Sequence, residues 1–133
     1  MNRMIYWLPA AVWAGFIFFL STQPMGEKPA WWFNNADKVI HCVLFGALSV
    51  FLFAGFRKGQ GYTFRKSALL AFCVTFIYGA SDELHQFMTP TRSPDFADLL
   101  ADAAGASIVF LGILRPRINT PACNAVPGTA GRD

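Results

Sequence analysis

The sequence predicts an all-α protein, a four-helix transmembrane bundle, from three observations. More than half of the residues are hydrophobic, and charged residues are sparse. The hydrophobic residues fall into four runs of about 15 to 18 residues, close to the length that crosses the hydrocarbon core of a bilayer. None of these runs has the polar face that a water-facing amphipathic helix needs. A soluble four-helix bundle would leave this all-round apolarity unexplained.

One membrane domain is expected over residues 1–115, with spans at residues 4–20, 39–56, 67–86 and 95–114. The first run follows Arg3, as the apolar part of a signal peptide would. It is longer than such a segment, and no small-residue cleavage site follows, so an uncleaved first helix is predicted. Residues 116–133 combine proline, glycine, asparagine and threonine with few large apolar residues, so this tail is expected to be disordered.

The charges are distributed unevenly along the chain. Residues 57–66 hold four basic residues, and further arginines flank the spans at Arg3 and Arg115. Lys and Arg near the ends of spans mark the cytoplasmic side, so an N-in/C-in topology is predicted. Every acid except Asp133 then lies on the outer side. The net charge of +3 is therefore a sign of topology, and no nucleic-acid partner is expected.

Polar residues mark the outer end of the second span. Asp37 and His41 are four residues apart and share one helix face, beside Lys38. At about 1.5 Å per residue, His41 lies roughly 24 Å from the cytoplasmic end of this helix. The preceding loop contains the adjacent pair Trp31 and Trp32, which we interpret as anchors at the membrane interface. Stacking of these rings on a sugar or a lipid head group is the alternative.

The densest group of ionisable residues lies where the third span ends and the fourth begins. The two spans are antiparallel, so these residues meet on the outer side with those of the second span. Asp102 is expected about 18 Å from the cytoplasmic end. A lone carboxylate at that depth is costly, so it needs a partner, water or a proton. The predicted outer polar cluster consists of Asp37, Lys38, His41, Tyr78, Asp82, Glu83, His85, Gln86, Arg92, Asp95, Asp98 and Asp102.

Several functions remain open for the outer polar cluster. It could be a network of ion pairs that locks the helices together. It could instead bind the polar head group of a lipid, a cell-wall precursor or a glycopeptide, with Arg92 contacting an anion. The excess of acids argues against a pyrophosphate ligand unless a cation bridges it. Proton or ion movement through the same residues is a further alternative.

A metal-dependent hydrolase of a lipid-linked substrate is the remaining alternative, in which a metal would activate water. The catalytic residues and any cofactor are not identified by the sequence, which lacks the HExxH zinc motif. Hard cations prefer carboxylates and zinc accepts imidazole. On this basis the candidate metal ligands are His41, His85, Asp82 and Asp98.

Three motifs resemble the VanZ-like membrane proteins: STQP at residues 21–24, DKVIH at 37–41, and YGASDELHQFMTPTRSPDFADLLADAAG at 78–105. The resemblance covers roughly residues 18–112. It implies a multi-pass protein of the bacterial cytoplasmic (inner) membrane, with a role in the cell envelope or in susceptibility to teicoplanin-type glycopeptides. One departure is Asp102, where asparagine is common in the family. A charged aspartate would change the electrostatics of the fourth helix, whereas a protonated one would mimic that asparagine as a hydrogen-bond donor.

Overall fold

The computed structural model describes residues 3–23, 33, 35–88 and 95–111, and all the regular secondary structure in these residues is helical. This confirms the all-α prediction. The elements in chain order are a 3-10 helix η1 (Arg3–Trp7), α1 (Leu8–Thr22), α2 (Ala36–Ala54), a π-helical turn η2 (Gly55–Gly59), α3 (Phe64–Phe87) and α4 (Phe96–Leu111).

Three stretches of helix are long and apolar enough to cross a membrane: Arg3–Thr22, Ala36–Gly59 and Phe64–Phe87. Large apolar side chains point outward from all four α-helices, among them Val12, Val43, Ile77 and Ile108, each more than half exposed. An apolar surface of this extent, on helices long enough to cross a bilayer, is typical of a membrane protein. The predicted end of the fourth span near Leu114 and the tail at 116–133 lie outside the described residues.

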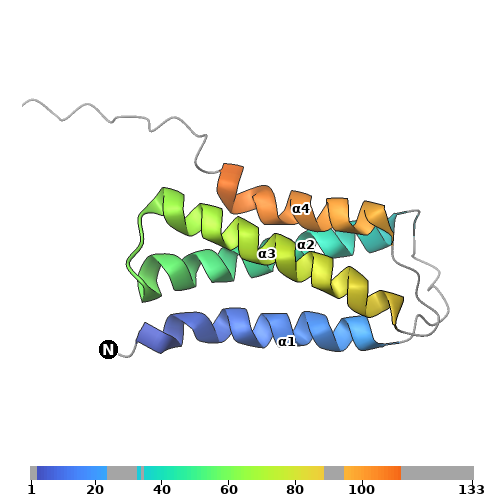
Figure 1. Ribbon diagram of the computed structural model, residues 1–133, viewed down its shortest axis with the longest axis horizontal. Coiled ribbons are helices and arrows are strands. Elements are labelled where there is room, and N and C mark those ends of the chain that lie inside the picture. The colour runs from blue at the N-terminus through green and yellow to red at the C-terminus, as the bar shows by residue number, and fades with distance from the viewer. Residues whose placement is uncertain (1–2, 24–32, 34, 89–94, 112–133) are drawn as a thin grey trace, which may run out of the picture.

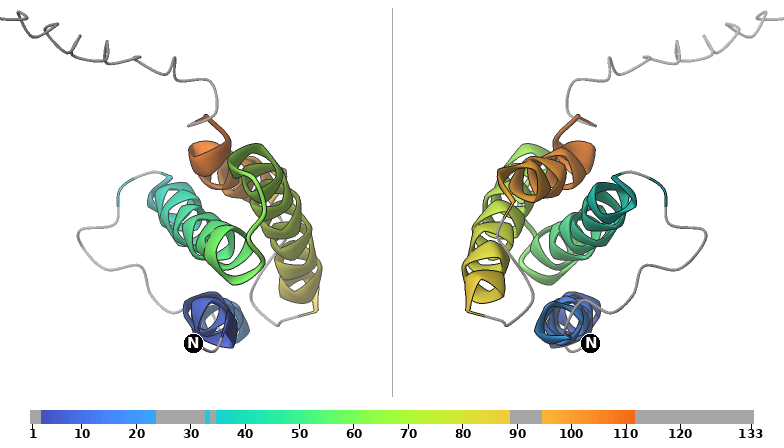
Figure 2. Two further views of the ribbon diagram at one scale, coloured as in Figure 1. Left: turned by 90° about the vertical axis from the view of Figure 1, so that its left-hand side faces the viewer. Right: turned by 90° about the vertical axis from the view of Figure 1, so that its right-hand side faces the viewer.

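The four α-helices run alternately up and down along a common direction (Figure 1). η1 and the α2–α3 turn lie at one end of the bundle, while α2 and α4 begin at the other end. α2 and α3 form a central pair (Figure 2), with α4 packed against one side of this pair and α1 against the other. This arrangement brings the polar beginnings of α2 and α4 beside the polar end of α3.

The helix boundaries follow from local chemistry. α1 has Pro9 in its first turn, where proline loses no helical hydrogen bond. At the start of α3, the Thr63 side chain accepts a hydrogen bond from the Lys66 N–H at 3.4 Å. At the start of α4, the Asp95 carboxylate accepts one from the Ala97 N–H at 2.9 Å. Asp95 therefore caps the first turn of the helix that carries Asp98 and Asp102.

Glycines let α2 and α4 approach closely. A Cβ atom built on Gly105 would lie 2.3 Å from the carbonyl oxygen of Cys42, and one on Gly46 would lie 3.5 Å from the carbonyl oxygen of Gly105. The Ser49 hydroxyl also donates to the Ala106 carbonyl at 3.0 Å. Contact between backbones is typical of small residues at helix interfaces in membranes. It holds Asp102, one turn before Gly105, directly beside α2.

Candidate functional site

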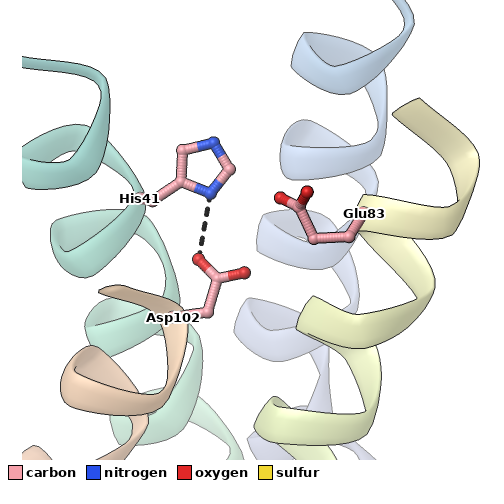
Figure 3. Close-up of side chains that lie close together, drawn as sticks. All are labelled: His41, Glu83 and Asp102. Carbon is pink, nitrogen blue, oxygen red and sulfur yellow. Dashed lines mark hydrogen bonds and ion pairs between the residues drawn. The ribbon is translucent and has the colours of Figure 1, made fainter. Parts of the chain in front are cut away.

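Three ionisable side chains from three helices meet inside the bundle. His41 comes from α2, Glu83 from α3 and Asp102 from α4 (Figure 3). The His41 Nδ1 and Asp102 Oδ1 atoms are 3.0 Å apart, within hydrogen-bond distance. A potential ligand atom from each of the three residues lies within 4.8 Å of the others. We call this group the His41–Glu83–Asp102 triad.

The triad carries polar atoms that lack partners. Asp102 is fully buried and Glu83 is 8% exposed. Glu83 Oε2 accepts a hydrogen bond from the Asp95 N–H at 3.1 Å. In contrast, Glu83 Oε1 and Asp102 Oδ2 are buried and have no hydrogen-bond partner among the residues that the structure describes. Buried polar atoms are nearly always paired in proteins, so two orphaned oxygens in one small group need a physical explanation.

Two glycines position the Asp102 side chain. A Cβ atom on Gly79 of α3 would lie 2.8 Å from Asp102 Oδ2, so the carboxyl group occupies the space that a larger residue would fill. Gly105 sets the distance of α4 from α2, as described above. The carboxyl group is therefore held between the two central helices, and the Glu83 side chain points toward it from α3 (Figure 3).

A second polar group lies closer to the end of the bundle. The Lys38 ammonium is 2.8 Å from Asp95 Oδ2, 3.0 Å from Asp98 Oδ1 and 3.4 Å from Asp37 Oδ2. We call these four residues the Lys38 network. Its side chains are partly exposed, from 12% for Asp98 to 49% for Asp95. Three carboxylates surround one ammonium, so the network keeps a negative excess when all groups are ionised.

Other residues of the predicted outer polar cluster face α1 instead. The Ser21 hydroxyl donates to Asp82 Oδ1 at 2.5 Å, and the Gln86 amide donates to Asp82 Oδ2 at 2.9 Å, both in buried positions. The Tyr78 hydroxyl donates to the Ala14 carbonyl at 2.7 Å. The imidazole of His85 lies against the ring of Phe18, with centroids 4.9 Å apart. These residues connect α3 to α1.

Among the described residues, the structure thus divides the predicted cluster into three groups: the triad, the Lys38 network and the residues that face α1. Of the ligand set His41, His85, Asp82 and Asp98, only His41 belongs to the group of potential metal ligands found among the described residues. Glu83 and Asp102 complete that group. Arg92, Trp31 and Trp32 lie outside the described residues, so their predicted roles remain predictions.

The candidate metal ligands chosen from the sequence did not include Glu83, yet this residue belongs to the triad. The signal that would have identified it is Gly79, four residues earlier and on the same helix face. A glycine within an apolar span marks close approach of another helix. The contact of Ser21 with Asp82 was not predicted either; its signal is a small polar residue at the outer end of the first span.

A family model described as VanZ/LLP1 matches residues 6–116. The match covers most of the chain and includes α1 to α4. The chain therefore belongs to the VanZ/LLP1 family, which confirms the resemblance of its motifs to VanZ-like proteins. Searches of curated proteins and of solved structures gave no match. Family membership and the long apolar helices together show a VanZ-like membrane protein.

Proposed function

We propose that this VanZ/LLP1 family member binds the polar head group of a lipid, a cell-wall precursor or a teicoplanin-type glycopeptide, and so acts in the bacterial cell envelope. The observation that supports this most is the Lys38 network. It lies at the helix ends, where a head group would sit, and it is partly exposed. Its excess of carboxylates suits a ligand rich in amino or hydroxyl groups, or an anion bridged by a cation.

The proposal includes a four-span, N-in/C-in topology in the inner membrane. Arg57 and Lys58 lie in η2, which packs beside η1 at the end of the bundle opposite the Lys38 network. Basic residues mark the cytoplasmic side, so the Lys38 network faces outward. Reporter fusions should show residues 59–62 in the cytoplasm and residues 25–30 outside. The reverse pattern would place the network on the cytoplasmic side and contradict an envelope ligand.

Binding can be tested by mass spectrometry of the protein purified in mild detergent. The wild type should retain a native lipid or precursor, and the double variant Asp95→Asn/Asp98→Asn should lose most of it. Asp82→Asn is a matched control, because it also neutralises an acid of this end of the bundle but at a position that faces α1. Arg92→Ala tests the predicted anion contact. Identical bound species in all four proteins would contradict the proposal.

The antibiotic role can be tested in cells. A strain that expresses the wild type should differ in teicoplanin susceptibility from a strain without the gene. The Asp95→Asn/Asp98→Asn variant should behave like the strain without the gene, although its folded amount in the membrane is unchanged. Equal susceptibility of all three strains would remove the glycopeptide role and leave the lipid or precursor as the ligand.

A second function, metal-dependent hydrolysis of a lipid-linked substrate, is supported by the His41–Glu83–Asp102 triad. In that function the triad would hold a metal that lowers the pKa of a bound water molecule. Release of inorganic phosphate from a lipid-linked diphosphate by the purified protein is the test. The activity should disappear in His41→Ala and persist in Asp82→Asn. No phosphate release from the metal-supplemented wild type would rule out this hydrolase function.

A further inference from the structure

We infer that the His41–Glu83–Asp102 triad is a binding site for one divalent transition-metal cation of the zinc or manganese class. The inference goes beyond head-group binding and does not depend on it, because it concerns the buried group below the Lys38 network. It follows from three features of the triad: the chemistry of its donor atoms, their distances, and the oxygens that lack partners.

The donor set suits a metal of intermediate hardness. Imidazole nitrogen is a ligand for zinc, iron and nickel, and carboxylate oxygen is a ligand for manganese and magnesium. One nitrogen with two carboxylates therefore favours a cation that accepts both. Zinc sites that bind a water molecule or a substrate typically have three protein ligands and one open position. The triad supplies three protein ligands.

The distances are close to those of a bound ion. Ligand atoms on a tetrahedral zinc, at about 2.0–2.2 Å from the metal, lie about 3.3–3.6 Å from one another. The distance of 3.0 Å between His41 Nδ1 and Asp102 Oδ1 is slightly shorter than this spacing. The largest separation within the set is no more than 4.8 Å. We therefore expect rotations of the three side chains to bring these atoms to the spacing of a bound ion.

The orphaned oxygens are the independent observation. Glu83 Oε1 and Asp102 Oδ2 belong to residues more than nine-tenths buried, and within the described part of the chain neither oxygen accepts a hydrogen bond. A buried carboxylate is costly unless it is paired or coordinates a metal. One divalent cation would provide a partner for both oxygens at once. With a neutral imidazole it would also cancel the two negative charges, which matters for a group at membrane depth.

A proton shared between the two carboxyl groups is the competing occupant. It would satisfy both oxygens through one hydrogen bond and leave one negative charge. The two occupants differ in a measurable way, because only the cation needs His41 as a ligand and only the cation is removed by a chelator. The experiment below therefore separates them.

The test measures metal binding to the full-length protein, purified in detergent without a histidine tag and stripped with a chelator. Zn²⁺ and Mn²⁺ are titrated by calorimetry, and the metal content after desalting is measured by mass spectrometry. The wild type should bind one ion per chain. Loss of an outer-shell partner weakens metal sites by about 10–100-fold, so removal of a ligand in Glu83→Gln or Asp102→Asn should weaken binding at least as much.

Asp82→Asn provides the matched control. Asp82 is adjacent to Glu83 and similarly buried, but it bonds to Ser21 and Gln86. This variant should bind the metal as the wild type does. Absence of binding to the wild type, or equal affinity in the wild type and Glu83→Gln, would overturn the inference. Head-group binding is measured separately on variants of the Lys38 network, so the failure of either proposal is recognisable.

A wild-type measurement decides the question even if the triad variants do not fold. Co²⁺ replaces zinc in sites of this kind and reports its ligands in the visible spectrum. A spectrum typical of nitrogen and oxygen donors, reversed by added Zn²⁺, supports the triad. No spectral change, or a cobalt–thiolate charge-transfer band that reveals a cysteine ligand, overturns it.

Discussion

The central α2–α3 pair contacts α4 and α1 through two different kinds of interface. On the α4 side, glycines bring backbones together, as at Gly105 against Cys42. On the α1 side, bulky aromatic residues lie at the interface, and Trp13 of α1 packs edge-on against Phe51 of α2 with centroids 5.7 Å apart. An apolar cavity of about 240 Å³ remains there, lined by Trp7, Leu48 and Tyr78 among others.

This difference matters for the candidate site. A glycine-to-backbone contact has no side-chain freedom, so the position of α4 relative to α2 is tightly determined. The His41–Glu83–Asp102 triad depends on that position. The α1 side is connected by single hydrogen bonds such as Trp13 Nε1–H to the Leu44 carbonyl at 2.9 Å. We therefore expect substitutions to have large effects on the α4 side and smaller effects on the α1 side.

The largest effect is expected for Gly105→Ala. The new methyl group would lie 2.3 Å from the Cys42 carbonyl oxygen, and because this atom belongs to the backbone, whole helices must move apart. Overpacking of this kind costs about 3 kcal/mol or more. The free energy of unfolding in detergent, or the folded fraction in size-exclusion chromatography, measures the loss. The metal affinity of the triad should fall as well.

Two glycine variants serve as controls for this prediction. Gly46→Ala adds a methyl group with neighbours at 3.4 Å and beyond, which is ordinary contact, so its cost should not exceed about 1 kcal/mol, the lower end of the range for overpacking. Gly15→Ala meets nothing within 4 Å and should be close to neutral or slightly stabilising. A loss for Gly46→Ala as large as for Gly105→Ala would show that the contact geometry of α2 and α4 is misassigned.

An intermediate effect is expected for Asp82→Ala. This change leaves the Ser21 hydroxyl and the Gln86 amide without their acceptor in a buried position. The expected loss is about 1–3 kcal/mol in the free energy of unfolding. Ser81→Ala is the control, since its exposed hydroxyl bonds to the Tyr78 carbonyl of the same helix and not to α1 among the described residues. Equal thermal stability of the two variants would show that Asp82 does not fasten α3 to α1.

A small effect is expected for Tyr78→Phe. The substitution removes the hydrogen bond to the Ala14 carbonyl and keeps the ring, which packs against Phe45. Single hydrogen bonds between membrane helices contribute about 0.6 kcal/mol on average. Thermal denaturation in detergent should show a correspondingly small shift. A loss above about 2 kcal/mol would exceed the largest measured bonds of this kind and would mean that α1 is coupled as tightly as α4.

The helices could be predicted from the sequence because apolar runs of membrane length do not depend on their neighbours. The gathering of polar residues at one end of the bundle could also be predicted, because it follows from the antiparallel order of consecutive helices. The sequence did not predict which neighbouring helix each acid faces. Asp82 and Glu83 are adjacent, and successive residues on a helix point about 100° apart, so one faces α1 and the other faces α2 and α4. Which of the two acids faces which helix depends on how the helices are arranged around α3, and helical periodicity carries no information on that arrangement.

The central claim is that the His41–Glu83–Asp102 triad is a ligand site and not an ion-pair lock. Its most direct test is the free energy of unfolding of metal-free Glu83→Gln relative to the metal-free wild type. A ligand site without its ligand contains two neighbouring carboxylates that repel each other, each with one oxygen unpaired among the described residues, so the variant should be as stable as the wild type or more stable. An ion-pair lock would lose stability on the same change, by an amount comparable to Asp82→Ala, and that result would contradict the claim.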